Sequence, residues 1–412
     1  MRQAGAACAC VALLGVACSD GSNPPADNVA RVSVDYGLPN IGYVNGLFAD
    51  VTVCVPGSTS DCQTIDHVLV DTGSTGLHLI GSVLTLSLPA WTDDRGTPLA
   101  ECSQFISGSF WGPLRGADFS IAKEQAKNLA IQVSEEATYP MPAGCTGTDI
   151  SAPDQLGANG ILGVGASLQD CGSRCAADLG PNSENPGVYY ACSSAAADGC
   201  KAAAVPVAKQ LSNPVAFFSQ DNNGTIIKLP AIPAEGAPSV TGSLVFGIDT
   251  RDNNRLEQAT VIPLDDYGQF LTAYPTNATS AAFAFLDSGS NAMYFLNSAE
   301  TNIPTCSSVD HPSLSAFYCP SSTLNVSATI RAFSSLADFT VNFRVANAIT
   351  LTSSRYNIAF DDLAAPSAPS KSGTSFMPTY FDWGLPFYFG RNVFTAIEGK
   401  VTAGHAGPFV AF

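Results

Sequence analysis

Short runs in which apolar and polar residues alternate recur along the chain from Val32 onward. Residues 47–54 and 63–70 show this alternation and predict the two arms of a hairpin, joined by the loop 56–61. The 36 glycines and 27 prolines are spread along the sequence and indicate frequent turns between such runs. The pattern therefore predicts a mostly β protein.

One short signature occurs twice, each time at the end of an apolar run of β type. Both copies place an aspartate, a hydroxyl residue, a glycine and a serine in that order. The copies are Asp71, Thr72, Gly73 and Ser74 in the first half, and Asp287, Ser288, Gly289 and Ser290 in the second. This repeat predicts two similar lobes that each supply one aspartate to a shared cleft. Two carboxyls at one site cannot both ionise freely, so one would hold a proton while the other stays charged, and together they would activate a water molecule.

Composition narrows the class of protein. The 412 residues suffice for two domains with full cores, and 46% hydrophobic against 13% charged residues fits a globular protein with many buried strands. The net charge of −17 argues against a nucleic-acid surface and against attraction to anionic lipid. We therefore expect no nucleic-acid partner.

The first 17 residues predict an export signal. Arg2 supplies its positive start, and residues 4–16 form an apolar segment that is too short to span a bilayer. The ending Gly-Val-Ala-Cys18 is typical of a bacterial lipoprotein signal, in which Cys18 carries the lipid; ordinary signal cleavage is the alternative. Residues 18–29 are then expected to form a flexible tether. The prediction is an exported protein, either secreted or in the bacterial cell envelope, whose membrane contact is a lipid at Cys18.

Ten cysteines follow Cys18, most of them close in sequence to another. The local pairs are Cys54 and Cys62, Cys171 and Cys175, Cys192 and Cys200, and Cys306 and Cys319, which leaves Cys102 and Cys145. An even set at close spacings in an exported chain predicts disulfides, although spacing alone leaves the connectivity open. Zinc is the weaker alternative, because the four histidines are scattered and none lies at ligand spacing. We expect neither a metal nor a cofactor.

A Gly-Ser tip between aromatic residues predicts a hairpin at 105–112. Its tip contains Phe105, Ser107, Gly108 and Ser109. Such a hairpin could project over a cleft as a flap, and an ordinary surface hairpin is the alternative.

In their order along the chain, these features resemble the pepsin-like aspartic proteases. The resemblance is carried by the two aspartate signatures, the hairpin around Gly108, and the segments 159–163, 242–249 and 388–390. Segments 159–163 and 388–390 each place two apolar residues before a glycine, well after the aspartate of their own half. The segment 381–387 makes the chain similar to an uncharacterised bacterial family of secreted pepsin-like proteins and lipoproteins.

This resemblance implies an all-β, bilobal fold with a central cleft between two β-barrels of about six strands each. The N-terminal lobe would comprise residues 30–213 and the C-terminal lobe residues 214–412. Asp71 and Asp287 would hold the attacking water without a metal. The hydroxyls of Thr72 and Ser288 and the backbones of the two glycines would fix the carboxylates. Ser74 and Ser290 would donate hydrogen bonds to the outer oxygens.

Two positions depart from the family pattern. The flap tyrosine is matched by Phe105, and the tryptophan that partners this tyrosine is matched by His78. Both changes remove the same hydrogen bond, which predicts a looser flap and a slow enzyme. Near the cleft, His78 would be expected to gain a proton at about pH 6 to 7.

The sequence therefore predicts a monomeric, exported aspartic endopeptidase that binds an extended polypeptide as a strand in its cleft. The alternative is a non-catalytic pepsin-like scaffold that binds peptides or an envelope partner. The duplicated aspartate signature favours the enzyme, whereas Phe105 and His78 favour the binding protein.

Overall fold

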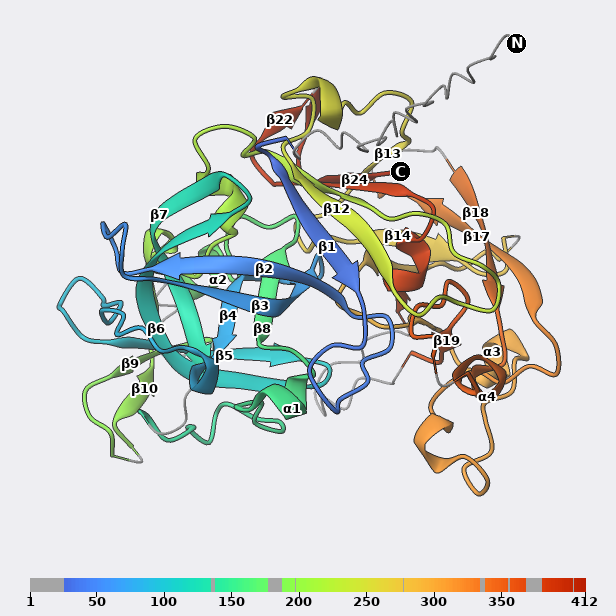
Figure 1. The fold of residues 1–412 in the computed structure, drawn as a ribbon, viewed down its shortest axis with the longest axis horizontal. Helices are drawn as coiled ribbons and strands as arrows, with labels where there is room; N and C mark the ends of the chain where they lie inside the picture. The colour runs from blue at the N-terminus through green and yellow to red at the C-terminus, as the bar shows by residue number, and fades with distance from the viewer. Residues whose placement is uncertain are drawn as a thin grey trace, which may run out of the picture.

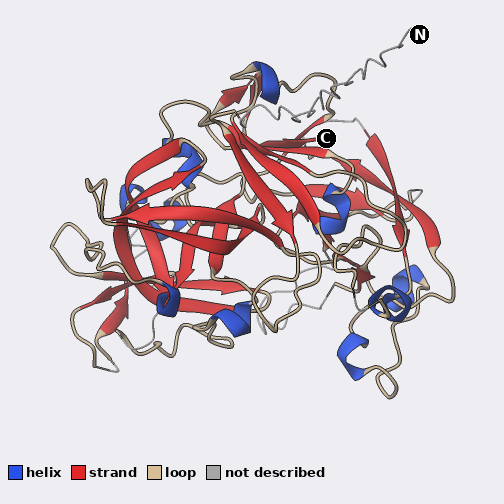
Figure 2. Cartoon of the chain, in the orientation of Figure 1, coloured by secondary structure: helices blue, strands red, loops and turns tan. Residues whose placement is uncertain are grey.

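The computed structural model describes residues 26–134, 138–176, 187–196, 198–276, 278–333, 338–354, 356–367, 380–402 and 404–412. The predicted export signal, Cys18 and most of the predicted tether lie outside these residues. Strands make up most of the regular structure, as the alternating pattern predicts (Figure 2). None of the described helices is long and apolar enough to cross a membrane.

The strands are β1 (Val29–Val34), β2 (Leu47–Cys54), β3 (Cys62–Asp71), β4 (Thr75–Ile80), β5 (Leu99–Phe105), β6 (Gly108–Ile121), β7 (Glu124–Ser134), β8 (Gly160–Val164), β9 (Tyr189–Cys192), β10 (Cys200–Ala202), β11 (Gly224–Lys228), β12 (Val240–Phe246), β13 (Val261–Pro263), β14 (Phe270–Ala273), β15 (Ala282–Leu286), β16 (Met293–Phe295), β17 (Leu324–Arg331), β18 (Asp338–Val345), β19 (Ala364–Ala365), β20 (Phe381–Trp383), β21 (Asn392–Ala396), β22 (Val401–Thr402), β23 (His405–Ala406) and β24 (Phe409–Ala411). The α-helices are α1 (Pro153–Leu156), α2 (Ser173–Ala176), α3 (Ser298–Thr301) and α4 (Ala348–Thr352). Short 3-10 helices lie at Gly81–Val83, Val207–Lys209, Pro214–Phe217, Asp252–Asn254, Pro312–Leu314 and Leu385–Tyr388.

A closed barrel forms from the first half of the chain. Neighbouring strands follow the order β6-β7-β4-β8-β3-β2, and β2 also pairs with β6, which closes the ring (left in Figure 1). The residues that face its interior are apolar and buried; in β3 they include Val68 and Val70. Closure leaves no free edge among these six strands.

The second half of the chain builds a seven-stranded sheet in the order β18-β17-β14-β15-β20-β16-β19 (right in Figure 1). Its core is aromatic: the Trp383 ring stacks on Phe381 at 4.4 Å between ring centroids and contacts Phe343 and Phe387 edge-on. Phe381 in turn stacks on Phe295 at 4.9 Å.

Strands from both halves form the sheet that joins the two lobes. The order continues from β2 through β1, β12, β11, β21 and β24 to β13, and β1 pairs with β12 along its whole length. The predicted mainly β, bilobal fold is therefore confirmed. The proposed boundary between residues 213 and 214 stays a prediction, since this shared sheet draws on strands from both sides of it.

Five disulfides lie among the described residues. They join Cys54 to Cys62, Cys102 to Cys145, Cys171 to Cys175, Cys192 to Cys200, and Cys306 to Cys319. The predicted pairing of all ten cysteines after Cys18 is confirmed. Such a set is typical of exported proteins.

Removal of the disulfide with the longest loop is expected to destabilise the fold most. The Cys102–Cys145 bridge spans 43 residues, whereas Cys54–Cys62 spans 8. Loop-closure entropy predicts losses of about 4 kcal/mol for Cys102→Ser with Cys145→Ser, and about 2.5 kcal/mol for Cys54→Ser with Cys62→Ser. Denaturant unfolding of the two double variants measures both losses, and a larger loss for the short loop would contradict this account.

Candidate active site

The two predicted aspartates lie at equivalent ends of two strands. Asp71 is the last residue of β3, which pairs in parallel with β8 and places Asp71 opposite Gly163. Asp287 follows β15, which pairs in parallel with β20, and its backbone N–H donates to the carbonyl of Trp383 at 3.1 Å. Each aspartate and the three residues after it form what we call an elbow: residues 71–74 and 287–290. The structure brings both elbows together.

The hydroxyls of Thr72 and Ser288 bind the opposite elbow. Thr72 Oγ1 donates to the carbonyl of Leu286 at 3.0 Å and accepts from the N–H of Ser288 at 3.0 Å. Ser288 Oγ donates to the carbonyl of Val70 at 2.7 Å and accepts from the N–H of Thr72 at 3.1 Å. The expectation that these hydroxyls fix the carboxylates is wrong, because their hydrogens go to backbone carbonyls; they fix the two lobes to each other.

Tyr388 adds a contact that no sequence motif predicts. Its hydroxyl lies 2.8 Å from Thr72 Oγ1. Because Thr72 already donates to Leu286, Tyr388 is the donor of this bond. The phenol is fully buried, so this bond satisfies a polar group that would otherwise be costly to bury.

Each carboxyl is held by its own elbow. Asp71 accepts from the N–H of Gly73 at 2.7 Å and from Ser74 Oγ at 2.5 Å. Asp287 accepts from the N–H of Gly289 at 2.8 Å, from Ser290 Oγ at 2.8 Å, and from the N–H of Ser290 at 3.2 Å. The glycine backbones and both serines thus occupy the positions expected for them. Asp287 accepts one more hydrogen bond than Asp71, which favours the negative charge at Asp287.

Glycine is required at the third position of each elbow by the opposite carboxyl. A Cβ on Gly73 would lie 2.8 Å from Cγ of Asp287, and a Cβ on Gly289 would lie 2.8 Å from Cγ of Asp71. A methyl group at either position would push the two aspartates apart.

Burial and like charge change the ionisation of this pair. Burial and then the negative charge of Asp287 raise the pKa of Asp71 well above its usual range, and the two carboxyls lie within hydrogen-bonding reach. The protonated form of Asp71 is therefore favoured. Among the described residues, no group of three or more His, Cys, Asp or Glu is arranged to hold a metal ion.

The glycine that matches Gly163 in the second lobe is Gly384. A Cβ on Gly163 would collide with the backbone of Thr75, and a Cβ on Gly384 would collide with the backbone of Ala292 and Ser290. The expectation that segment 388–390 plays this part is wrong. Gly390 instead forms a turn at φ +77° after the 3-10 helix Leu385–Tyr388. The sequence pattern missed Gly384 because an aspartate, Asp382, occupies one of the two positions before it that were expected to be apolar.

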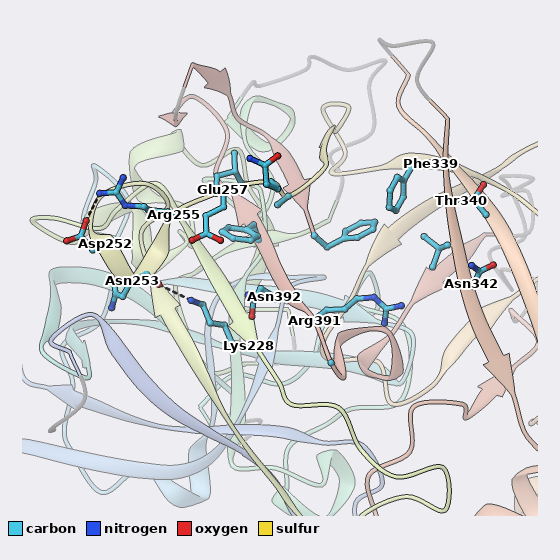
Figure 3. Close-up of a pocket in the computed structure, with 17 residues that line it drawn as sticks. Lys228, Asp252, Asn253, Arg255, Glu257, Phe339, Thr340, Asn342, Arg391 and Asn392 are labelled. Atoms are coloured by element: carbon cyan, nitrogen blue, oxygen red, sulfur yellow. Dashed lines mark hydrogen bonds and ion pairs between the residues drawn. The ribbon is translucent and has the colours of Figure 1, made fainter. Parts of the chain in front are cut away.

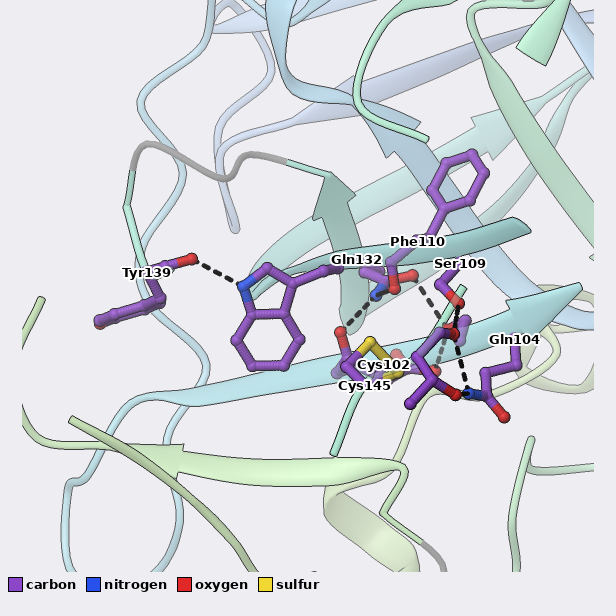
Figure 4. Close-up of a disulfide and its surroundings, with 11 residues drawn as sticks. Cys102, Gln104, Ser109, Phe110, Gln132, Tyr139 and Cys145 are labelled. Carbon is purple, nitrogen blue, oxygen red and sulfur yellow. Dashed lines mark hydrogen bonds between the residues drawn. A yellow bond between two sulfur atoms is a disulfide. The ribbon is translucent and has the colours of Figure 1, made fainter. Parts of the chain in front are cut away.

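The predicted flap is the turn between β5 and β6. Phe105 and Gly108 pair across it, Ser107 is exposed, and Ser109 Oγ donates to the carbonyl of Thr146 at 2.5 Å. The Cys102–Cys145 disulfide attaches the same hairpin to the loop after β7 (Figure 4). The hairpin is thus held near its tip, at Ser109, as well as at Cys102 in β5.

Phe105 and His78 contact each other through their rings, in place of the hydrogen bond that the family's tyrosine and tryptophan form. Their rings meet edge-on at 5.6 Å between centroids, and Phe110 contacts both. His78 Nδ1 lies 2.6 Å from Gln132 Oε1, whose amide N–H groups donate to backbone carbonyls. Nδ1 therefore carries the hydrogen. Burial lowers the pKa of His78, so the expected protonation at about pH 6 to 7 is not supported.

A second pair of carboxyls, the buried Glu101 and the partly exposed Asp170, lies at the hairpin arm β5. Glu101 of β5 accepts from Ser103 Oγ at 2.6 Å and is almost fully buried. Burial and then the charge of Asp170 raise the pKa of Glu101 well above its usual range, and burial raises the pKa of Asp170 to about 6. Tyr189 donates a hydrogen bond to Asp170. Sequence reasoning did not identify this pair, because neither residue belongs to a motif.

Two cavities differ in where they lie relative to Asp71 and Asp287, the pair of aspartates that we call the dyad. One of about 220 Å³ adjoins the first elbow and is lined by Gly73, Ser74, Tyr267 and Phe285, among others. Another of about 700 Å³ is lined by none of the elbow residues (Figure 3). All the basic side chains of the second cavity already have partners: Lys228 donates to the carbonyl of Asn253 at 2.8 Å, Arg255 binds Asp252, and Arg391 donates to the carbonyl of Phe387 at 2.6 Å.

A comparison with protein families matches residues 24–412 to a family described as "Protein of unknown function (DUF3443)". The chain belongs to this family. The search of curated proteins returned no match for this member.

Among solved structures, the DUF3443 chain is similar to an aspartic proteinase from Irpex lacteus. The identity is 15%, the match covers 93% of this chain and 96% of that chain, and the TM-score is 0.50. At this identity the likeness establishes a pepsin-like fold for this DUF3443 member. Its place in a bacterial family of lipoproteins stays a prediction.

Loss of one reciprocal hydroxyl is expected to destabilise the whole molecule. Ser288→Ala leaves the Thr72 N–H and the Val70 carbonyl without their partner in a fully buried position, at an expected cost of about 2 to 4 kcal/mol. Ser315→Ala removes an exposed hydroxyl that donates to Pro312 and serves as the control, with a change within about 0.5 kcal/mol. Equal stability of the two variants in denaturant unfolding would show that the elbows do not hold the lobes together.

Buried carboxyls with raised pKa values predict a fold that is most stable in acid. Between the ordinary glutamate pKa of about 4.3 and the higher folded value, native Glu101 keeps a proton that the unfolded chain releases, so stability falls as pH rises. The loss is at most about 1.4 kcal/mol per pH unit for this group. Glu101→Gln is expected to flatten the fall of the melting temperature between acid and neutral pH. An unchanged slope would mean that Glu101 is ionised in the native state.

Proposed function

We propose that this chain is an exported aspartic endopeptidase that hydrolyses peptide bonds with water activated by Asp71 and Asp287. The observation that carries the proposal is the dyad itself: two carboxyls within hydrogen-bonding reach, each held by the N–H of an elbow glycine and by an elbow serine. Sharing one proton gives the pair an acid and a base at the same place.

The two aspartates take different roles. Asp287, with three donors directed at it, is the carboxylate that removes a proton from water. Asp71, which keeps the shared proton, donates to the carbonyl oxygen of the peptide bond as water attacks its carbon. When the C–N bond breaks, the amine leaves with the proton taken from water, and Asp71 regains its own.

The substrate is expected to be an extended polypeptide. The cavity of about 220 Å³ beside Gly73 and Ser74 is lined in part by the aromatic residues Tyr267 and Phe285, which suits an apolar side chain of a peptide that passes the dyad. A strand-like substrate can bind by backbone hydrogen bonds, which give affinity without strict sequence preference. We expect a monomer with no cofactor, and a lipid at Cys18 as its membrane contact.

A non-catalytic peptide-binding scaffold is the second candidate. It is favoured by Phe105, which supplies no hydroxyl at the position of the family's flap tyrosine. The packing of Phe105 on His78 supplies bulk in this place but no hydrogen bond to a substrate.

Replacement of either aspartate is expected to abolish hydrolysis and to retain the fold. Asp71→Asn and Asp287→Asn keep the shape of the side chain but prevent the pair from sharing a proton, so cleavage of a diverse peptide mixture should fall by at least about 10³-fold. Asp94→Asn, at an exposed site, is the matched control and should cleave like the parent. Mass spectrometry of the peptides measures cleavage. Parental activity in either dyad variant would reject the assignment, and peptide binding without cleavage by the parent would favour the scaffold.

A further inference from the structure

A third carboxyl, that of Asp382, lies beside the dyad. Asp382 is the middle residue of β20, the strand next to β15, and pairs with Phe285 two residues before Asp287. The equivalent residue of the first lobe is Ile161, which pairs with Leu69 two residues before Asp71. The second lobe thus places an acid where the first lobe has an apolar side chain.

The surroundings of Asp382 do not offset the cost of burying its carboxyl. It is completely buried, and neither of its carboxyl oxygens has a hydrogen-bond partner among the described residues. An ionised carboxylate in such a place would cost several kcal/mol. Its neighbours Phe381 and Trp383 belong to the aromatic core, so the strand cannot shift to bring Asp382 to the surface.

The groups that face Asp382 do not supply a positive charge. They are the carboxyls of Asp71 and Asp287, the hydroxyl of Ser290, and the phenols of Tyr294 on β16, Tyr380 beside β20 and Tyr388 in the 3-10 helix. The three tyrosines are neutral in acid, as any phenol with a pKa near 10 is, and burial raises their pKa values further. Burial and then the charge of Asp287 raise the pKa of Asp382 well above its usual range.

The hydroxyl of Ser290 is the group through which Asp382 can act on Asp287. Ser290 has one hydrogen, and it is donated to Asp287 Oδ2 at 2.8 Å. Ser290 Oγ still has lone pairs that can accept a hydrogen bond, and Ser290 lies beside the end of β20, since its carbonyl accepts from the N–H of Leu385 at 2.8 Å. An ionised Asp382 would compete with Asp287 for the Ser290 hydrogen, whereas a protonated Asp382 can donate to Ser290.

We propose that Asp382 is a positioning residue that stays protonated and donates its O–H to Ser290 Oγ, so that Ser290 keeps donating to Asp287. The chain of donors Asp382–Ser290–Asp287 stabilises the negative charge on Asp287 and leaves the shared proton on Asp71. The catalytic part of this inference rests on the proposed hydrolytic function, whereas the protonation of Asp382 does not.

Two substitutions test the role of Asp382. Asp382→Asn is neutral at every pH and can donate an amide N–H to Ser290, so kcat is expected within about threefold of the parent at acid pH, with activity retained to higher pH. Asp382→Ile copies Ile161 and has no donor, so kcat should fall about tenfold with KM little changed. Asp362→Asn is the control, because Asp362 is a buried acid of the same lobe with one unpartnered oxygen, whose charged neighbours are Asp361 and Arg344. Its kcat and pH profile should stay parental.

Protonation is measured independently of activity by carbon-13 NMR of the full chain labelled at the aspartate carboxyl carbons. At about pH 6 the parent should show a protonated carboxyl signal that Asp382→Asn lacks, since an ordinary aspartate is ionised there. This readout does not need Asp382→Ile to fold. The proposal is overturned if the spectrum of Asp382→Asn keeps every protonated carboxyl signal of the parent. It is also overturned if a folded Asp382→Ile variant has the kcat and the pH profile of the parent. If the parent cleaves no peptide at any pH, the proposed function fails, and the NMR signal still decides whether Asp382 carries a proton.

Discussion

Four reciprocal hydrogen bonds hold the two lobes together: Thr72 and Ser288 bind each other's side-chain hydroxyls and backbone N–H groups, and donate to the carbonyls of Leu286 and Val70 at the ends of the opposite strands. They join two lobes that are built from different halves of the chain, and they do so at a buried point where loss of a partner is expensive. Because each hydroxyl both donates and accepts, the position of one elbow fixes that of the other. The glycines at the third elbow positions then let each carboxyl lie close to the opposite backbone.

The ionisation of the site follows from this geometry. Two carboxyls that are held together, one of them buried, cannot both carry a charge freely, so a proton is shared and the site becomes acid and base at once. The same preference for protonated carboxyls recurs at Glu101 and Asp170 at the hairpin arm β5 and at Asp382 behind the dyad. A fold that buries so many acids without basic partners is suited to work on the acid side of neutrality.

Short sequence patterns were sufficient to predict the fold class and most of the candidate site. The elbows, the hairpin at 105–112 and the disulfide pairs are each encoded by residues close in sequence, and the alternation of apolar residues identified the β class. The roles of Thr72 and Ser288 could not be read in this way, because their partners lie on the other half of the chain. Gly384 was missed because Asp382 broke the apolar pattern that was expected before it. The pairing of His78 with Gln132 depends on the register of β4 and β7, which a sequence does not specify.

Catalysis by the two aspartates is tested by the pH dependence of peptide-bond hydrolysis by the full chain, followed from about pH 3 to about pH 7 on a diverse peptide mixture. A dyad that needs one protonated and one ionised carboxyl predicts a bell-shaped profile of kcat/KM with its maximum on the acid side of neutral. A rate that rises steadily towards neutral pH would require a different base. No cleavage at any pH, in a folded protein, would mean that the two aspartates form a structural joint between the lobes and not a catalytic site.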